Sequence, residues 1–382
     1  MEFGFSEDQK LLRDSVIKFA QRELNTDLHE RDRNQTFSRE LWRKCAEIGI
    51  QGLPVPEQYG GSGCDPLTCA IALEAFGYGC KDGGLVFSLS AHLLACVVPI
   101  WKHGSDLQRE RYLPGLCDGT LLGAHAITEP GSGSDTFSMR MRADRVEGGW
   151  RLNGTKMFIS NGPVADLCVV FAVTDATKGF HGGVTGFVVE ASTPGFKPAQ
   201  KLEKMGLRTS PVGEVVFDNV FVTDDALLGG VGGGAGGFAT AMDWERILLV
   251  AGHVGIMQRL LDASVEYART RKQFGQTIGK FQAVAHKIAD MKVQLEAARL
   301  LTYQSAWRLQ HARSASLDAS VTKLFVSESL VRAALDTVQI HGGYGFMTEY
   351  DVERALRDSI GATIYSGTSE MQRNIIARWL GL

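Results

Sequence analysis

Apolar positions follow two different periods along this chain. From residue 6 to about residue 117 they recur three and four residues apart, which is typical of amphipathic helices. Ser6 is a plausible N-cap for the first of these helices, with Gln9 three residues further on. The helices predicted in this part of the chain span residues 6–24, 36–48, 66–76, 85–101 and 106–117.

Between about residues 123 and 222 the chain has short runs of β-branched and aromatic residues, separated by turn residues. Asn153-Gly154 and Asn161-Gly162 are sequences that favour tight turns. This pattern predicts an antiparallel β domain. Its expected strands span residues 150–152, 157–159, 167–173, 185–189 and 214–220.

Seven glycines lie between Gly229 and Gly237, a composition typical of a flexible linker. Helical periodicity follows to the end, over residues 238–271, 281–312, 316–340, 352–357 and 369–379. The order helices, β domain, helices predicts an α+β protein with three domains. We expect an N-terminal α-helical domain over residues 1–121, a central β domain over 122–228 and a C-terminal helical bundle over 229–382.

Composition places the chain among globular proteins, with 44% apolar and 22% charged residues. The net charge of −3 argues against nucleic acid or an anionic membrane as a partner. The apolar run at 85–101 is short for a membrane span and is interrupted by polar residues, so we expect a buried helix and no membrane insertion. The acidic start of the chain and seven cysteines without CxxC spacing favour a reducing cytoplasm.

Two segments of the β domain carry candidate ligand-binding groups. The turn at residues 126–135 exposes backbone N–H groups beside the hydroxyls of Thr128 and Ser134. Such groups can bond the edge of a flat heteroaromatic ring, or the segment can be a solvated turn. Phe158 and Ser160 offer an aromatic face and a hydroxyl on a nearby strand, although an isolated aromatic on a strand usually belongs to the core.

Two further segments lie at helix ends in the C-terminal part of the chain. The basic cluster at 269–275 includes Arg271, and a guanidinium suits bidentate contact with phosphate. The alternative is a solvated helix end that the helix dipole favours. The glycine turn at 340–345 allows backbone to approach a pyrophosphate, or it is a helix C-cap.

Glu245 is the candidate general base. Its neighbours at positions 241, 242, 248 and 249 are apolar and share its helix face. A carboxyl group on an apolar face should have a raised pKa, as a base acting near neutral pH requires. The alternative at this point is a structural salt bridge, for example to Arg246.

The motifs, taken in order, resemble the signatures of the acyl-CoA dehydrogenase family. They are residues 128–135, residues 271–275, Gln339 with the turn 342–345, and residues 367–370 with Gln372. The resemblance covers nearly the whole chain. It implies an N-terminal helical domain, a central antiparallel β domain and a C-terminal four-helix bundle. It also implies FAD bound non-covalently between the last two domains and reaching into a neighbouring subunit of a homodimer or homotetramer.

The resemblance assigns cofactor and substrate residues by position. It implies that the flavin is lined by Ile127, Thr128, Gly133, Ser134, Phe158 and Ser160. It implies that the pyrophosphate and adenosine end is held across the subunit interface by Arg271, Phe274, Gln339 and Gly343, and that Thr368 completes the site. Substrate contacts are expected from Ser134, Arg246 and Tyr365.

The position of the base departs from the commoner pattern. Many family members carry glutamate just before the last Gly-Thr, where this chain has Ser366. A minority, including isovaleryl-CoA dehydrogenase, place it where this chain has Glu245, so the resemblance implies that Glu245 removes the α proton. It implies that the backbone N–H of Ser366 helps to polarise the thioester carbonyl while hydride passes to the flavin.

Residues 82–92, 244–246 and 364–372 are also similar to flavin dehydrogenases of secondary metabolism that oxidise prolyl groups on a peptidyl carrier protein. We therefore expect dehydrogenation of a prolyl-like acyl thioester on a carrier protein. The alternatives are a branched- or short-chain acyl-CoA dehydrogenase and a non-dehydrogenating flavin-binding member such as a monooxygenase. The expected electron acceptor is an electron-transfer flavoprotein or oxygen. His92, on an apolar helix, fits a core residue better than a substrate contact.

Overall fold

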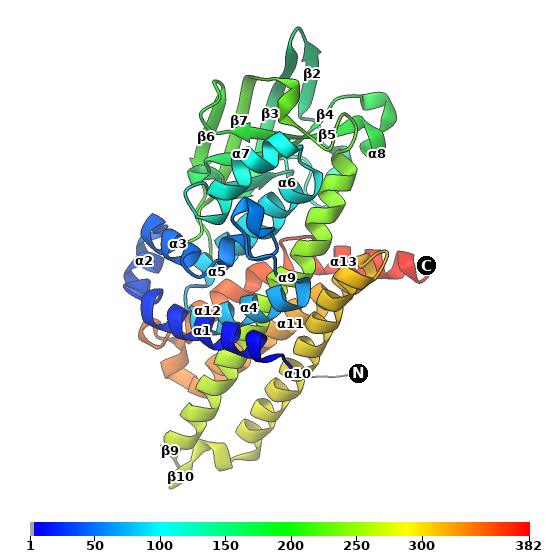
Figure 1. Ribbon diagram of the computed structural model, residues 1–382. Coiled ribbons are helices and arrows are strands. Elements are labelled where there is room, and N and C mark those ends of the chain that lie inside the picture. Colours follow the sequence, from blue (N-terminus) through cyan, green and yellow to red (C-terminus); the bar gives the residue numbers. More distant parts are fainter. Residues whose placement is uncertain (1–3) are drawn as a thin grey trace.

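The β domain lies at one end of the molecule and the long C-terminal helices extend to the other end. The N-terminal helices pack across the middle (Figure 1). The computed structural model describes residues 4–382. Ser6 caps the first helix as predicted, because its hydroxyl accepts a hydrogen bond from the Gln9 N–H and the Gln9 side chain accepts one from the Ser6 N–H. The first four helices are α1 (Glu7–Glu23), α2 (Leu28–Asn34), α3 (Arg39–Ala46) and α4 (Pro66–Gly79).

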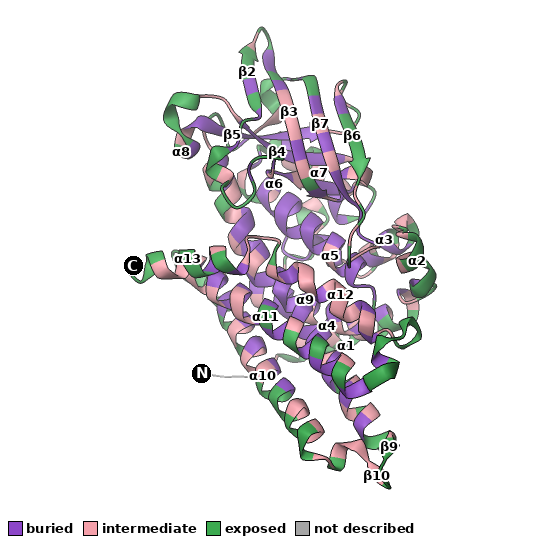
Figure 2. Ribbon diagram, turned by 180° about the vertical axis from the view of Figure 1, so that it is seen from behind, coloured by how far each residue is buried: buried purple, intermediate pink, exposed green. Residues whose placement is uncertain are grey.

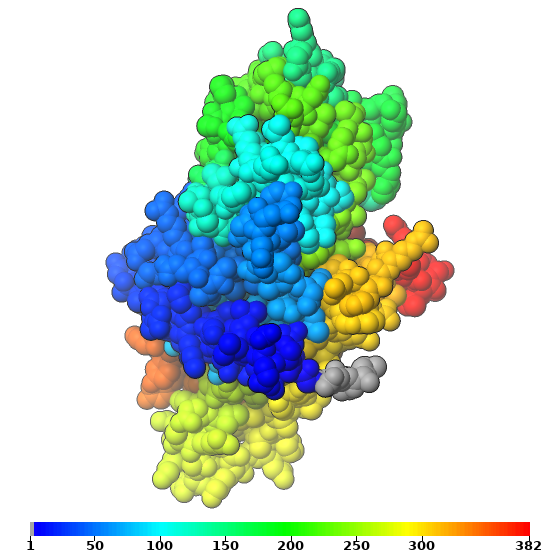
Figure 3. All heavy atoms as spheres, viewed as in Figure 1, coloured from blue at the N-terminus to red at the C-terminus, as the bar shows by residue number. Residues whose placement is uncertain are grey.

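Three further helices, α5 (Gly83–His92), α6 (Val98–His103) and α7 (Asp106–Cys117), complete this part. A five-residue π-helical turn at Leu93–Val97 joins α5 to α6. The stretch Gly83–His103 is apolar and long enough to cross a membrane, but 94% of its apolar 18-residue window is buried inside the protein, which confirms the prediction of a core helix. Figure 3 shows the N-terminal segment, blue to cyan, lying across the front of the molecule.

The β domain is one sheet in which seven strands run in the order β6-β7-β3-β2-β4-β5-β8, with β1 (Gly123–Ala126) paired to β4. Most pairings are antiparallel, as predicted, whereas β4 pairs in parallel with both β1 and β2. The other strands are β2 (Arg142–Val146), β3 (Gly149–Ser160), β4 (Leu167–Val173), β5 (Val184–Glu190), β6 (Phe196–Lys201), β7 (Val212–Val222) and β8 (Leu227–Leu228).

The prediction of a turn at Asn153-Gly154 is wrong, because both residues lie inside β3. The pairing of β3 with β7 shifts register between Leu152 and Gly154, so the glycine marks a bulge. A β-carbon on Gly154 would lie 2.7 Å from the Met141 side chain, which explains why glycine stands there. The predicted turn at Asn161 is confirmed: this residue has φ +65° and ends the strand.

The glycine tract is also not a flexible linker throughout. Helix α9 (Gly234–Thr270) begins inside it and includes Gly236 and Gly237. Gly234 packs so closely that a β-carbon on it would lie 2.7 Å from the Val184 carbonyl oxygen of β5. The tract therefore lets the first turn of α9 approach the sheet.

Helix α9 is the central element of the C-terminal bundle. It packs against α4, α10 (Gln282–His311) and α11 (Ser316–His341), and much of it is buried (Figure 2). Contact with α4 is close enough that a β-carbon on Gly77 would lie 2.0 Å from the Gly252 carbonyl oxygen. The short strands β9 (Lys272–Gln273) and β10 (Gln276–Thr277) follow α9, and α12 (Val352–Ile360) and α13 (Ser369–Trp379) end the fold.

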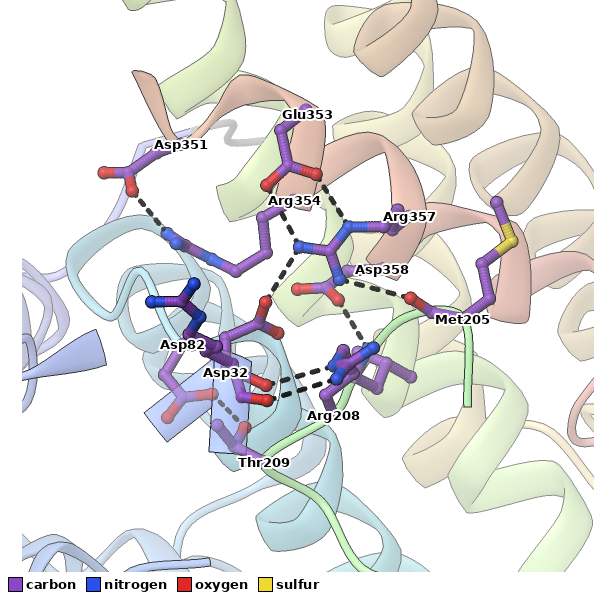
Figure 4. A network of polar contacts seen from close by, with 12 residues as sticks. Asp32, Asp82, Met205, Arg208, Thr209, Asp351, Glu353, Arg354, Arg357 and Asp358 are labelled. Atoms are coloured by element: carbon purple, nitrogen blue, oxygen red, sulfur yellow. Dashed lines mark hydrogen bonds and ion pairs between the residues drawn. The ribbon is translucent and has the colours of Figure 1, made fainter. Parts of the chain in front are cut away.

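A network of charged groups joins all three parts of the chain (Figure 4). Arg357 of α12 donates hydrogen bonds to Asp32 of α2, at 2.8 Å, and to Glu353, at 2.7 Å. Arg208, on the loop between β6 and β7, donates to the Asp32 carbonyl. Helix α2 carries only one buried residue, Leu28, and so has no apolar periodicity by which it could be predicted. Its contacts in this network account for its place in the fold.

Candidate active site

Glu245 lies on α9 with its carboxyl group in a closed environment. The residue is 8% exposed, and its Oε1 accepts a hydrogen bond of 2.8 Å from the Ser366 hydroxyl. Burial raises the pKa of this carboxyl group, against the opposing effects of the Ser366 hydrogen bond and the nearby charges of Arg246 and Lys323. The direction of the shift agrees with the sequence-based expectation. The alternative of a salt bridge to Arg246 is not supported, because that guanidinium bonds the backbone instead.

The turn at Ser366-Gly367 is held by side chains from three helices. Ser366 has φ +55°, a conformation that costs a non-glycine residue on the order of 1 kcal/mol or more. Its carbonyl accepts hydrogen bonds from Arg246, at 3.1 Å, and Gln372, at 3.2 Å. The Gly367 carbonyl accepts from Lys323, at 2.7 Å, and also from Gln372. These contacts fix the backbone of Ser366 beside Glu245.

The neighbouring residues of this turn have different surroundings. Thr368 caps α13, and its hydroxyl oxygen accepts a hydrogen bond of 3.3 Å from the Met371 N–H. Glu370 is a carboxylate in the same segment, but its side chain is 78% exposed and pairs with Arg373. Glu370 therefore lacks the burial that raises the pKa of the Glu245 carboxyl group.

A buried ion pair anchors the turn that follows β1. Lys156 is fully buried, and its ammonium group donates hydrogen bonds of 2.9 Å to the Glu129 carboxylate and to the Ile127 carbonyl. The same carboxylate accepts from the backbone N–H groups of Arg140 and Met141. These bonds tie the turn to β3, while residues 130–131 and 133–135 of the turn stay exposed.

Three of the predicted flavin-lining residues, Gly133, Ser134 and Phe158, are exposed in this part of the β domain. The Met157 N–H bonds the Thr128 carbonyl at 2.8 Å, which brings the turn beside Phe158. Phe158 is 65% exposed and has φ +59°, so neither packing nor local backbone preference explains an aromatic residue there. A β-carbon on Gly133 would meet nothing within 4 Å in the described part of the chain. Ser134 is exposed, Ser160 is half-buried and Ile127 is buried.

The second predicted group lies at the far end of the bundle. Arg271 and Phe274 are on the segment that forms β9 and β10, which Figure 1 shows opposite the β domain. Phe274 is 93% exposed with φ +50°, and the Arg271 guanidinium lies 5.4 Å from the Tyr344 ring. Gln339 and Gly343 are exposed in the same region. One chain therefore does not bring this group together with the group around Phe158.

A cavity of about 160 Å³ opens along α9 on the side of Leu249. Tyr365 lines it, with its ring 4.5 Å from that of Phe87 and its hydroxyl 2.9 Å from His253 Nε2. His253 was not predicted from the sequence, although it follows Glu245 by eight residues and so shares its helix face. His92 is a core residue as expected, bonded to the Leu116 carbonyl and the Gly123 N–H.

Comparison with known proteins places this geometry in context. Models of the acyl-CoA dehydrogenase N-terminal, middle and C-terminal domains match residues 6–120, 124–220 and 232–381. The L-prolyl-[peptidyl-carrier protein] dehydrogenase of Pseudomonas fluorescens is 41% identical over 383 residues, covering 100% of both chains. The mitochondrial isovaleryl-CoA dehydrogenase of Solanum tuberosum is 40% identical, covering 98% of this chain and 91% of that protein.

Solved structures give the same picture. The crystal structure of the prolyl acyl carrier protein oxidase AnaB matches with a TM-score of 0.97 and 44% identity, covering 99% of this chain and 100% of that one. A structure of PigA with FAD and proline matches with a TM-score of 0.97 and 40% identity over 100% of both chains. The predicted fold class is thereby confirmed, whereas the exact domain boundaries stay predictions.

The buried ion pair below the turn yields a stability prediction. Lys156→Met should lower the free energy of unfolding by about 3–5 kcal/mol, because it leaves the Glu129 carboxylate buried without its cation. Thermal and denaturant unfolding measure the effect. Lys197→Met, which breaks the exposed pair with Asp218 in the same domain, should change little. Equal effects of the two substitutions would contradict the importance assigned to the buried pair.

Proposed function

The chain belongs to the acyl-CoA dehydrogenase family, and we propose that it oxidises a prolyl group carried as a thioester on a peptidyl carrier protein. The reaction removes a proton from the α carbon and a hydride from the β carbon, and it produces an α,β-unsaturated thioester. The observation that carries this proposal is the buried Glu245 carboxyl group beside the fixed backbone of Ser366. A base is thereby available for the α proton of a thioester, and an N–H donor is available for its carbonyl oxygen.

Relatives named for prolyl substrates support the choice of acyl group. Two L-prolyl-[peptidyl-carrier protein] dehydrogenases match this chain end to end at 41% and 40% identity. Isovaleryl-CoA dehydrogenase is almost as similar, at 40%, so oxidation of a branched acyl-CoA is the second candidate. Overall identity does not separate the two substrates, and the distinction has to come from the side chains that contact the acyl group.

FAD fits the surfaces that the chain leaves open. The exposed Phe158 face, the open turn at Gly133 and the Ser134 hydroxyl can receive a flavin ring. When bound, FAD supplies the hydride acceptor. Arg271, Phe274, Gln339 and Gly343 would hold the pyrophosphate and adenosine end of a second subunit's FAD, because they lie at the other end of the molecule. This division requires a homo-oligomer.

The chain's own residues then perform three tasks. Glu245 accepts the α proton, as its raised pKa allows near neutral pH. The Ser366 N–H donates to the thioester oxygen as negative charge develops there, which lowers the barrier to proton removal. Arg246 holds the Ser366 carbonyl and so keeps that N–H in place. Ser134, Arg246 and Tyr365 are the residues we assign to substrate contact.

Reoxidation requires an external electron acceptor, and we assign an electron-transfer flavoprotein or oxygen to this step. Among the known structures, one described as an electron transferring flavoprotein of Acidaminococcus fermentans matches with a TM-score of 0.96 and 37% identity. All seven cysteines are unpaired, which agrees with a reducing cytoplasm as the location. A monooxygenase is the less favoured alternative because it has no need for the buried Glu245.

The substrate assignment is tested by anaerobic bleaching of the flavin in single turnover. We expect a prolyl thioester on a carrier protein to reduce the flavin faster than prolyl-CoA, isovaleryl-CoA or butyryl-CoA. If docking depends on an acidic carrier domain, the advantage should fall as salt screens opposed charges. Faster reduction by isovaleryl-CoA would decide for the second candidate, and no reduction by any thioester would decide for a non-dehydrogenating member.

Glu245→Gln tests the base. The substitution keeps the size of the side chain and removes its basicity, so FAD should stay bound while flavin reduction slows by about 10²–10⁴-fold. Stopped-flow absorbance measures the rate. Glu370→Gln is the matched control, because it makes the same substitution at a nearby glutamate. The Glu370 side chain is exposed, so we expect this variant to reduce its flavin at a rate near that of wild type. A fast Glu245→Gln enzyme with a slow Glu370→Gln enzyme would reverse the assignment.

Ser366→Ala tests the hydrogen bond from the Ser366 hydroxyl to Glu245. The sequence predicted a role only for the backbone N–H of Ser366, and the structure adds this contact. The hydroxyl hydrogen bond lowers the pKa of Glu245, so its loss should raise that pKa further. The base acts in its ionised form, so the acid limb of the rate profile should move to higher pH while the plateau above it changes little. An unchanged acid limb would mean that the hydroxyl does not tune the base.

A further inference from the structure

Aromatic side chains from two segments of the β domain pack together at its surface. Phe137, three residues after Ser134, is 57% exposed. Its ring lies 4.6 Å from that of Phe180 and 5.6 Å from that of His181, which is exposed as well. Both partners belong to the short segment α8 (Phe180–Gly183) between β4 and β5, which Figure 1 shows beside the start of α9. Contiguous exposed apolar surface of this kind marks a binding site more often than scattered single residues do.

The glycine tract before α9 extends this surface. A β-carbon on Gly232 would lie 2.7 Å from the Gly182 carbonyl oxygen, and the Gly232 N–H donates a hydrogen bond of 2.9 Å to the Thr185 hydroxyl. The tract is thereby held against α8 and β5, and its residue Val231 is 61% exposed. We call the surface formed by these residues the aromatic rim; it consists of Phe137, Phe180, His181 and Val231.

The aromatic rim is connected to Glu245 along one face of α9. Phe238 and Glu245 are seven residues apart, so they lie on the same face of the helix, about 10 Å from each other along its axis. The Phe238 ring lies 5.8 Å from that of Phe180, the same ring against which Phe137 packs. In the other direction from Glu245, every residue of α9 from 247 to 257 is buried. A chain that runs along this face from Glu245 therefore reaches the surface at the aromatic rim.

The aromatic rim is suited to an apolar partner surface. Lys178, the cation next to α8 in sequence, pairs with Asp175 of the same turn at 3.1 Å. Its charge is thus already neutralised within the segment, whereas the Phe137 ring is uncovered. Exposed aromatic side chains are the residues that most often carry the binding energy of protein–protein interfaces.

We propose that the aromatic rim docks the peptidyl carrier protein, with Phe137 as the main apolar contact, while the pantetheine arm runs along the face of α9 between Phe238 and Glu245. The inference rests on the proposed function and adds to it the surface that meets the carrier. A substrate attached to a protein through a flexible arm requires that protein to sit where the arm leaves the site. Acyl-CoA ends in a nucleotide instead, so the two kinds of substrate should respond differently to changes at Phe137.

The test compares one acyl group on two carriers. Prolyl-CoA and the prolyl thioester of the peptidyl carrier protein of the Pseudomonas fluorescens relative are the two substrates. Flavin reduction in single turnover is followed over a range of concentrations for wild type, Phe137→Ser, Phe137→Leu and Phe221→Ser. Phe221 is the matched control, because it is an aromatic residue of β7 in the same domain, 43% exposed, and is not part of the aromatic rim.

Phe137→Ser should raise the half-saturating concentration of the carrier thioester by about tenfold to a hundredfold, because it removes an aromatic anchor of the interface. The rate at saturation should stay within about twofold of wild type, and the half-saturating concentration of prolyl-CoA within about threefold, because neither depends on docking. Phe137→Leu keeps an apolar side chain and should lose less than Phe137→Ser, so it carries the test if the serine variant folds poorly. Phe221→Ser should behave as wild type.

Equal weakening of both substrates by Phe137→Ser would assign Phe137 to the arm that they share and overturn the inference. An unchanged half-saturating concentration of the carrier thioester would overturn it as well, as would a wild type that uses the two thioesters at equal concentrations. Loss of bound FAD from Phe137→Ser, or a smaller assembly on gel filtration, would mean that the cofactor or a second subunit covers Phe137 and would also decide against carrier docking.

The outcomes separate this inference from the proposed function. If the prolyl thioesters reduce the wild-type flavin and Phe137→Ser leaves the use of the carrier thioester unchanged, only the inference fails. If neither prolyl thioester reduces the wild-type flavin, the proposed function fails and the inference fails with it.

Discussion

The hydrogen bonds to the carbonyls of Ser366 and Gly367 are the constraint on which the site depends. Arg246 of α9, Lys323 of α11 and Gln372 of α13 all donate to this one turn. These bonds offset the cost of the positive φ at Ser366. They also fix the directions in which the Ser366 N–H and hydroxyl point. Without them the turn would be free to relax, and Glu245 would keep its burial but lose its partner. The packing of α9, α11 and α13 thus determines where the Ser366 N–H and hydroxyl lie relative to the Glu245 carboxyl group.

Elements with strong local rules could be predicted from the sequence, and elements set by packing could not. The ranges 106–117 and 369–379 agree with α7 and α13 at both ends, because a capping Ser or Thr precedes each helix and a glycine follows it. Asn153-Gly154 has the composition of a turn, but β3 pairs with β7 on both sides of it, and the two residues form a bulge within the strand. Glycine is required at the start of α9 because the helix packs closely against the sheet. The sheet residues lie far away in the sequence, so local sequence patterns do not reveal this requirement.

The candidate site divides in the same way. Glu245 could be found because its apolar neighbours share its own helix, so burial and the direction of its pKa shift follow from local periodicity. The Ser366 hydroxyl contact and the His253–Tyr365 pair join residues 121 and 112 positions apart. Such contacts depend on the packing of α9 against the C-terminal segment. Periodicity indicates which face of a helix is buried, but it does not indicate which side chain of another element will meet it.

The length of α9 separates the two groups of residues that we propose to bind FAD. Glu245 stands near the start of this helix and Arg271 directly follows its end, about 39 Å apart along the axis at the usual rise per residue. Groups that far apart on a rigid, largely buried helix cannot contact the same small ligand in one chain. Phe158 at one end and Phe274 at the other are both exposed aromatic residues with positive φ, so each end presents a surface that its own chain does not cover. We infer that the two surfaces are completed by one another in an oligomer, which makes cofactor binding and subunit assembly a single coupled equilibrium.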